Sequence, residues 1–148
     1  MRKSLKALLV LIAGASLATQ TLAGNASSST FIPAAEAKWA AVPGMDGIQI
    51  AVLEGDPSKG PSHFMLKFTG GFSAPLHHHS ADHFGTVVAG TLVLTSNGKE
   101  QKLPAGSFFA FSGQMPHATK CEAGAACVLS MDVRGKWDVV AEKVDAKK

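Results

Sequence analysis

The chain has no tyrosine, only two cysteines among its 148 residues, and no apolar run long enough to span a membrane. Without tyrosine, no phenolic hydroxyl is available as a catalytic base. The most apolar stretch, residues 7–18, covers a dozen positions, whereas a transmembrane helix needs about 20. Stable insertion into a membrane is therefore not expected.

The chain also has no excess of basic residues when residues 1–23 are left out of the count. Residues 1–23 have the pattern of a secretory signal peptide: a basic start, the apolar stretch, and small residues around the expected cut. They carry three of the fourteen basic residues and none of the eleven acidic ones, so the mature chain, beginning near Gly24, is formally neutral. We therefore expect a periplasmic or secreted protein that binds neither nucleic acid nor anionic membranes. A membrane anchor is the alternative, which the short apolar stretch disfavours.

The rest of the chain has room for one domain. We expect a leader at residues 24–44 with a short helical segment, the domain at 45–141 and a tail at 142–148. Short apolar or alternating runs, separated by Gly, Pro and Asn, predict an all-β sandwich or barrel. The Asn97-Gly98 pair suits a tight hairpin. The expected strands are 48–54, 63–69, 84–89, 91–96, 99–103, 107–111, 117–120, 126–132 and 137–141.

Four of the six histidines lie within seven residues: His77, His78, His79 and His83. In a strand, residues two apart face the same side, so His77 and His79 can converge while His78 points away. A tight corner at "SAD" could bring His83 back beside this pair. Neutral imidazoles suit Fe, Ni, Cu and Zn. We therefore predict a metal site, and surface positions for His63 and His78.

The spacing around these histidines resembles the first motif of the cupin superfamily. Gly71 is followed after five residues by His77, then by His79, after three residues by His83, and after six by Gly90. Cupins usually have glutamate at the position of His83. The stretch "HHHSADHFGTVVAGTL" is also similar to a group of secreted single-domain cupins whose function is largely unknown.

A second segment resembles the second cupin motif, whose histidine supplies the last metal ligand. Gly106 is followed after five residues by Ser112 and then by His117, and fifteen residues separate the two motifs. The family usually has proline, glycine and asparagine where this chain has Ser112, Gln114 and Cys121. The resemblance covers roughly residues 45–140.

The resemblance implies a cupin double-stranded β-helix, a jelly-roll-like barrel with one metal ion inside near one mouth. The ion would be a divalent transition metal (Fe, Ni, Zn, Cu or Mn), and the partner a small molecule. A homodimer paired through sheet edges is also implied. The implied metal ligands are His77, His79, His83 and His117. The side chains expected to fill the barrel are Leu92, Leu94, Phe108, Phe109, Phe111, Val128 and Leu129.

Three functions are compatible with such a site. Imidazole in place of the usual carboxylate keeps the site near a charge of +2, which favours an anionic ligand. The leading hypothesis is a dioxygenase-type enzyme acting on a small organic acid or enol. The alternatives are a redox-neutral lyase, isomerase or hydrolase, and a non-enzymatic protein that binds or senses metal or a small ligand. Neither Asp82 nor Glu100 is placed well enough to be assigned a catalytic role, and the missing tyrosine argues against cupin lyases with a tyrosine base.

The two cysteines, Cys121 and Cys127, enclose five residues that could form a hairpin loop. In an exported protein we expect them to form a disulfide. The alternative is a free Cys121 thiolate, which would face the same side of a strand as His117 and could bind a soft metal.

Overall fold

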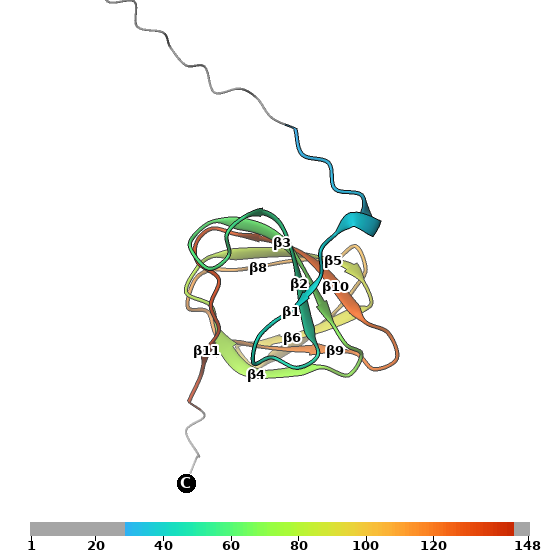
Figure 1. The fold of residues 1–148 in the computed structure, drawn as a ribbon. Helices are drawn as coiled ribbons and strands as arrows, with labels where there is room; N and C mark the ends of the chain where they lie inside the picture. The colour runs from blue at the N-terminus through green and yellow to red at the C-terminus, as the bar shows by residue number, and fades with distance from the viewer. Residues whose placement is uncertain (1–28, 144–148) are drawn as a thin grey trace, which may run out of the picture. The chain divides into compact units, whose positions relative to one another are not determined.

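The computed structural model describes residues 29–143, which consist almost entirely of β-strands and loops. Two antiparallel sheets face each other (Figure 1), one with the order β1-β2-β3-β10-β5-β8 and the other with the order β11-β4-β9-β6-β7. The strands are β1 (Ala40–Ala41), β2 (Ile48–Gly55), β3 (Ser62–Phe68), β4 (Ser73–His78), β5 (His83–Ala89), β6 (Thr91–Ser96), β7 (Lys99–Pro104), β8 (Phe108–Phe111), β9 (His117–Cys121), β10 (Cys127–Val133) and β11 (Val140–Ala141). The predicted all-β barrel-like fold is confirmed.

Two strands are missing from the expected strand ranges, although the histidine spacing predicted an extended segment at residues 77–79. Strand β4 contains Pro75, which has no amide hydrogen to donate to a sheet, and its pairing with β9 is irregular between Ala74 and His77. Strand β1 lies in the predicted leader and pairs with β2. The helical segment expected there is a single 3-10 turn, Ala34–Glu36.

The hairpin between β6 and β7 forms where the Asn-Gly pair predicted it. Ser96 pairs with Lys99, and the two residues between them, Asn97 and Gly98, have φ angles of 50° and 73°. Both angles lie in the left-handed region that this type of turn requires. The hairpin completes the edge of the five-stranded sheet.

The core lies between the two sheets. Alternation along β8 directs Phe109 and Phe111 toward it, whereas Phe108 is 63% exposed, so the expectation that Phe108 fills the barrel is wrong. Val128 is likewise only partly buried. Gly85 pairs with Phe109 and leaves room for its ring, because a Cβ at Gly85 would lie 2.2 Å from the Phe109 Cζ atom. The fully or nearly buried core residues are Phe64, Leu66, Phe68, Val87, Leu92, Leu94, Cys121, Cys127, Leu129, Met131 and Val133.

The structure contains the expected disulfide between Cys121 and Cys127, with a Cα–Cα distance of 5.8 Å. It joins the end of β9 to the start of β10 and therefore connects the two sheets. Because both sulfur atoms are bonded, Cys121 is not the thiolate ligand considered as the alternative.

The predicted signal peptide, residues 1–23, lies outside the described residues, as does most of the predicted tail. Glu142, at the start of that tail, is held in place because its amide donates a hydrogen bond to the Leu76 carbonyl oxygen at 3.1 Å. Between residues 29 and 143, no helix has the length and apolar character needed to cross a membrane.

Candidate metal centre

Four buried histidines gather at one end of the space between the sheets. His77 lies on β4 and pairs directly with His117, the first residue of β9. His79 follows β4, and His83 begins β5 in the opposite sheet. Their exposed fractions are 6%, 2%, 4% and 2% in that order, so all four face the interior.

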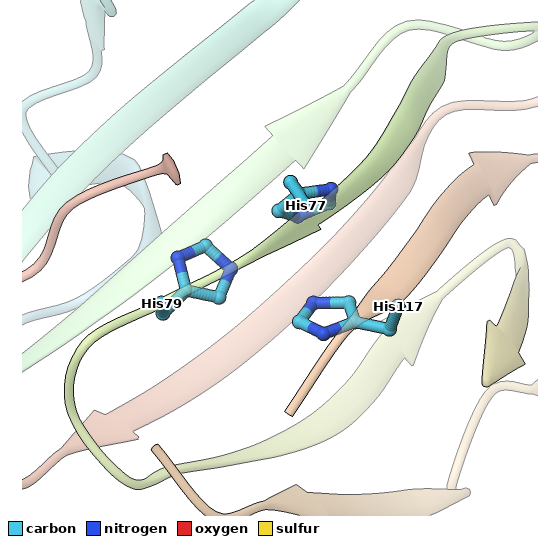
Figure 2. A group of neighbouring side chains, drawn as sticks. All are labelled: His77, His79 and His117. Carbon is cyan, nitrogen blue, oxygen red and sulfur yellow. The ribbon is translucent and has the colours of Figure 1, made fainter. Parts of the chain in front are cut away.

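Three of these histidines form a compact group of nitrogen donors. In His77, His79 and His117 the candidate ligand nitrogens all lie within 4.8 Å of one another (Figure 2). His83 lies beside this group but outside it, with its ring centroid 4.7 Å from that of His79 and 5.5 Å from that of His117. Whether His83 is a fourth ligand stays a prediction.

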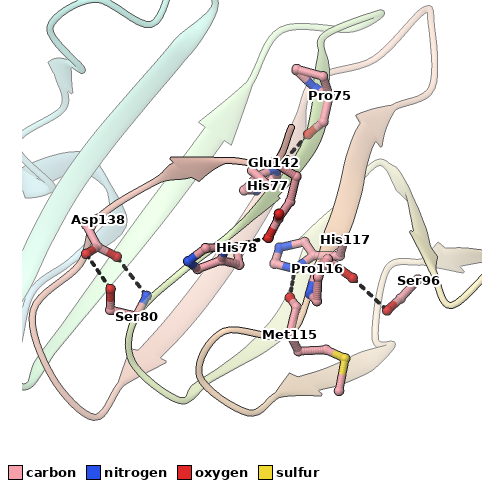
Figure 3. Close-up of polar contacts among 10 residues, drawn as sticks. All are labelled: Pro75, His77, His78, Ser80, Ser96, Met115, Pro116, His117, Asp138 and Glu142. Carbon is pink, nitrogen blue, oxygen red and sulfur yellow. Dashed lines mark hydrogen bonds and ion pairs between the residues drawn. The ribbon is translucent and has the colours of Figure 1, made fainter. Parts of the chain in front are cut away.

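Hydrogen bonds determine which nitrogen of each ring can bind a metal. The Nδ1–H of His77 donates to the Pro75 carbonyl oxygen at 2.7 Å, and that of His117 donates to the Met115 carbonyl oxygen at 3.0 Å (Figure 3). The Nδ1–H of His79 donates to the Asp138 carbonyl oxygen. Because a carbonyl oxygen can only accept, each Nδ1 carries the hydrogen and each Nε2 keeps its lone pair.

His83 follows the same rule, since its Nδ1 is 3.2 Å from the Ala81 carbonyl oxygen. A ring nitrogen held by a backbone carbonyl is the usual support of a metal-binding histidine, because it fixes both the tautomer and the ring orientation. The donor set of neutral Nε2 atoms thus fits one divalent transition metal, with His77, His79 and His117 as the residues that would hold it.

Aromatic stacking further restricts the rings. The Trp137 side chain stacks on His79 with a centroid distance of 3.8 Å and an interplanar angle of 18°. Phe111 stacks on His117 at 4.2 Å and 13°. Each contact fills the space into which the imidazole could otherwise rotate, so the nitrogen positions are largely preformed.

The electrostatics of the site favour neutral imidazoles. Burial lowers the pKa of His79 to about 3 and the pKa of His117 to about 4, and it also lowers the pKa of His83. The hydrogen bonds from Nδ1 oppose this effect, while repulsion among the charged forms of the rings adds to it. At neutral pH these rings are therefore in the form that binds metal.

The remaining singled-out residues lie elsewhere. His78 points away from the group, and its Nδ1 lies 2.6 Å from the Glu142 carboxylate (Figure 3). His63 is exposed on β3, and Glu100 is exposed on β7. The Asp82 carboxylate accepts a hydrogen bond from the Gly113 amide at 2.7 Å, which ties the loop after β4 to the loop before β9.

Two supporting residues, Trp137 and Asp138, were not singled out from the sequence. Besides its carbonyl bond to His79, Asp138 accepts hydrogen bonds through its carboxylate from the amide and the hydroxyl of Ser80, at 2.8 and 2.7 Å. Nearly sixty residues separate these partners, and no local spacing relates them.

The turn before His117 keeps its shape despite its departure from the cupin pattern. Gln114 stands where the family usually has glycine and adopts a φ of 65°, in the left-handed region that glycine favours. Its amide donates to the His79 carbonyl oxygen at 2.8 Å. The two histidine-bearing segments are therefore joined directly.

A cavity of about 390 Å³ adjoins the histidines. Both sheets line it, and all four buried histidines contribute to its wall together with Trp137. Most of the other lining residues are aliphatic or phenylalanine. The site is thus a set of nitrogen donors opening into an apolar space large enough for a small molecule.

The lowered pKa values predict that the metal-free protein loses stability in acid. Unfolded histidines titrate near 6.5, whereas the folded pKa values of His79 and His117 are about 3 and 4, so the unfolded chain binds more protons between these limits. The free energy of unfolding should be constant above pH 7 and fall as the pH drops from about 6.5, by at most about 1.4 kcal/mol per pH unit for each group.

Urea unfolding at several pH values between 7 and 4, with a chelator present, measures this dependence. The His79→Gln variant should show a shallower fall than the unmodified protein. The exposed His63 provides the control, because His63→Gln should leave the slope unchanged. An unfolding free energy that stays constant from pH 7 to pH 4.5 would contradict the burial of neutral histidines.

Comparisons with known proteins agree with this architecture. Residues 64–133 match the family model described as the cupin domain. A search of curated proteins finds no match. Among solved structures, KdgF from Halomonas sp. is 22% identical, with a TM-score of 0.61 over 72% of this chain and 94% of that chain.

Two further solved structures share the fold. The polyketide cyclase RemF from Streptomyces resistomycificus is 17% identical, with a TM-score of 0.66 over 80% of this chain and 89% of its own. A predicted oxalate decarboxylase from Thermotoga maritima is 19% identical, with a TM-score of 0.59 over 71% of this chain and 98% of its own. At these identities the likeness concerns the fold and transfers no activity.

The family match begins in β3, ends with β10 and includes every buried histidine of the candidate metal centre. Together with the two facing antiparallel sheets, it shows that this segment of the chain is a cupin domain.

Proposed function

We propose that the protein is an exported metal-dependent enzyme of the dioxygenase type that acts on a small organic acid or enol. The observation that carries this proposal is the convergence of three imidazole donors at the wall of an apolar cavity. Three neutral ligands leave a divalent metal its full positive charge, which favours an anionic substrate group.

When bound, the metal would act as a Lewis acid toward the substrate oxygen and, if redox-active, would support dioxygen chemistry. The chain contributes the rest of the site. Carbonyl partners orient the three imidazoles, Trp137 and Phe111 hold two of the rings, and the apolar wall keeps bulk water away from the reacting groups. Cleavage of an enol by dioxygen places both oxygen atoms in the products and needs no external reductant.

A redox-neutral reaction is the second candidate, and His83 is the observation that favours it. This histidine is buried, is neutral because burial lowers its pKa, and has a free Nε2 atom next to the group of three. Such a nitrogen could accept a proton from a bound substrate. The polyketide cyclase among the solved structures supports this candidate, because its name describes a different reaction on a similar fold.

Oxygen consumption separates the two candidates. We expect Fe(II)-loaded protein to consume oxygen in the presence of one member of a panel of enols and organic acids, and metal-free protein not to. Product formed without oxygen, and lost in His83→Gln while the metal content stays unchanged, would establish the redox-neutral reaction instead. Metal-replete protein that converts no member of the panel would argue against both.

Export is supported by the signal-like residues 1–23 and by the disulfide, since such bonds persist in oxidising compartments. We expect the protein recovered from the periplasm or the medium to begin near Gly24 and to carry oxidised Cys121 and Cys127. N-terminal sequencing and mass measurement before and after reduction test both points. An intact N-terminus in cytoplasmic protein would contradict the proposal.

A further inference from the structure

The cavity beside the histidines is lined mainly by apolar side chains. Among the described residues, no lysine or arginine lines it. Apart from the four histidines, its polar or charged lining residues are Ser73, Thr119 and Asp46, and Asp46 is exposed. The apolar residues that line it include Ile48, Ile50, Leu66, Phe68, Leu92, Leu94, Phe109, Leu129 and Met131.

Strand register shows that the cavity extends away from the histidines. His83 pairs with Val133, which also pairs with Ser62 at the beginning of β3. Ile48 pairs with Phe68 at the other end of β3, and both line the same cavity as His83. Leu66 and Phe68 are the β3 residues that line the cavity, so it extends from the histidines toward the end of β3 that pairs with Ile48.

Because no lysine or arginine among the described residues lines the wall, only some chemical groups can be bound there favourably. A carboxylate or phosphate placed away from the histidines would lose its hydration without meeting a cation, which is strongly unfavourable. A sugar or polyol would find hydrogen-bond partners only at Ser73, Thr119 and the exposed Asp46 among the described lining side chains beyond the histidines. An apolar group would instead gain from leaving water.

We propose that the cavity takes a small hydrophobic molecule with a single anionic or chelating head, and that the head lies at the histidines. The uncharged aromatic or aliphatic body lies between the sheets, among Leu66, Leu94 and Leu129. This inference deepens the proposed function, because the head would be bound by the same metal centre, and it excludes substrates with a second charge at the far end.

Three hydroxamates with one chelating head test the proposal: acetohydroxamate, benzohydroxamate and 4-carboxybenzohydroxamate. Zinc-loaded protein binds them without turnover, and calorimetry measures each affinity. Benzohydroxamate should bind at least about tenfold more tightly than acetohydroxamate, because its ring leaves water. The carboxylated compound should bind at least about tenfold more weakly than benzohydroxamate, because its carboxylate has no partner. Equal affinities, or tightest binding of the carboxylated compound, would overturn the proposal.

A matched pair of variants on β2 locates the effect. Ile50 lines the cavity, whereas Val52 is 45% exposed and does not line it. Ile50→Arg should reverse the preference between the last two compounds, and Val52→Arg should preserve it. Should Ile50→Arg fail to fold, the ranking by the unmodified protein still decides. Retention of the original preference in a folded Ile50→Arg protein would place the ligand body elsewhere.

A binding experiment on metal-free protein tests this inference independently of the proposed enzyme function. Metal-free protein should bind toluene and not benzoate, as followed by the fluorescence of Trp137 in a Trp39→Phe background. This preference depends on the cavity wall alone, so it survives if oxygen consumption is never observed. Binding of benzoate as tight as that of toluene would contradict the inference while leaving the metal centre intact.

Discussion

Replacing His79 with alanine should remove the bound metal, whereas the same change at its neighbour His78 should leave the metal content unchanged. His79 contributes one of three converging nitrogens, and His78 faces the opposite side, toward Glu142. Loss of an outer hydrogen-bond partner alone weakens metal sites by about 10- to 100-fold, so loss of a ligand should exceed about a hundredfold. Elemental analysis after equilibration with zinc, on protein purified without affinity metal, measures the effect.

The same measurement on His83→Ala determines the size of the ligand set. Because its nitrogen lies outside the group of three, we expect the variant to keep one metal per chain. Loss of the metal would make His83 the fourth ligand. Equal metal contents in His78→Ala and His79→Ala would show that the converging nitrogens are not the site.

Removing the metal should lower the melting temperature markedly at neutral pH. His117 lies far along the chain from His77 and His79, so the three nitrogens converge only in the folded protein and metal binding stabilises that state. At a free metal concentration a thousandfold above Kd, this contribution is about 4 kcal/mol. For a domain of this size it corresponds to a shift of about 10 °C or more.

Calorimetric scans of zinc-loaded protein with and without a chelator measure the shift. The difference should shrink to zero in acid, where protons compete for the imidazoles, and should be absent in His79→Ala at every pH. A chelator that lowers the melting temperature of His79→Ala as much as that of the unmodified protein would trace the effect to another site.

Local patterns predicted a large part of this architecture. Alternation within a strand separates His78 from His77 and His79, because side chains two residues apart must share a face. The Asn97-Gly98 turn followed from the φ angles that its type requires. Strand β4 was harder to recognise, since Pro75 interrupts its pairing. Phe108 was wrongly assigned to the core because Phe108, Phe109 and Phe111 are all aromatic, so the inward and outward positions of this strand cannot be told apart by residue type.

The supporting contacts of the site could not be predicted in this way. Trp137 and the Asp138 carbonyl meet His79 across nearly sixty residues, and nothing in their spacing specifies that meeting. Nor could the cavity be inferred, because its wall combines residues from strands of both sheets. That no lysine or arginine among residues 29–143 lines it becomes visible only when those strands are assembled.

The sequence by itself thus determined the strand pattern, the turn types and the three histidines that form the donor group, since each depends on neighbours along the chain or on motif spacing. The tertiary structure alone decided which ring nitrogens remain free, that His83 lies beside the donor group and outside it, and that the adjoining space is apolar. These properties arise from contacts between distant segments, which the packing of the two sheets creates.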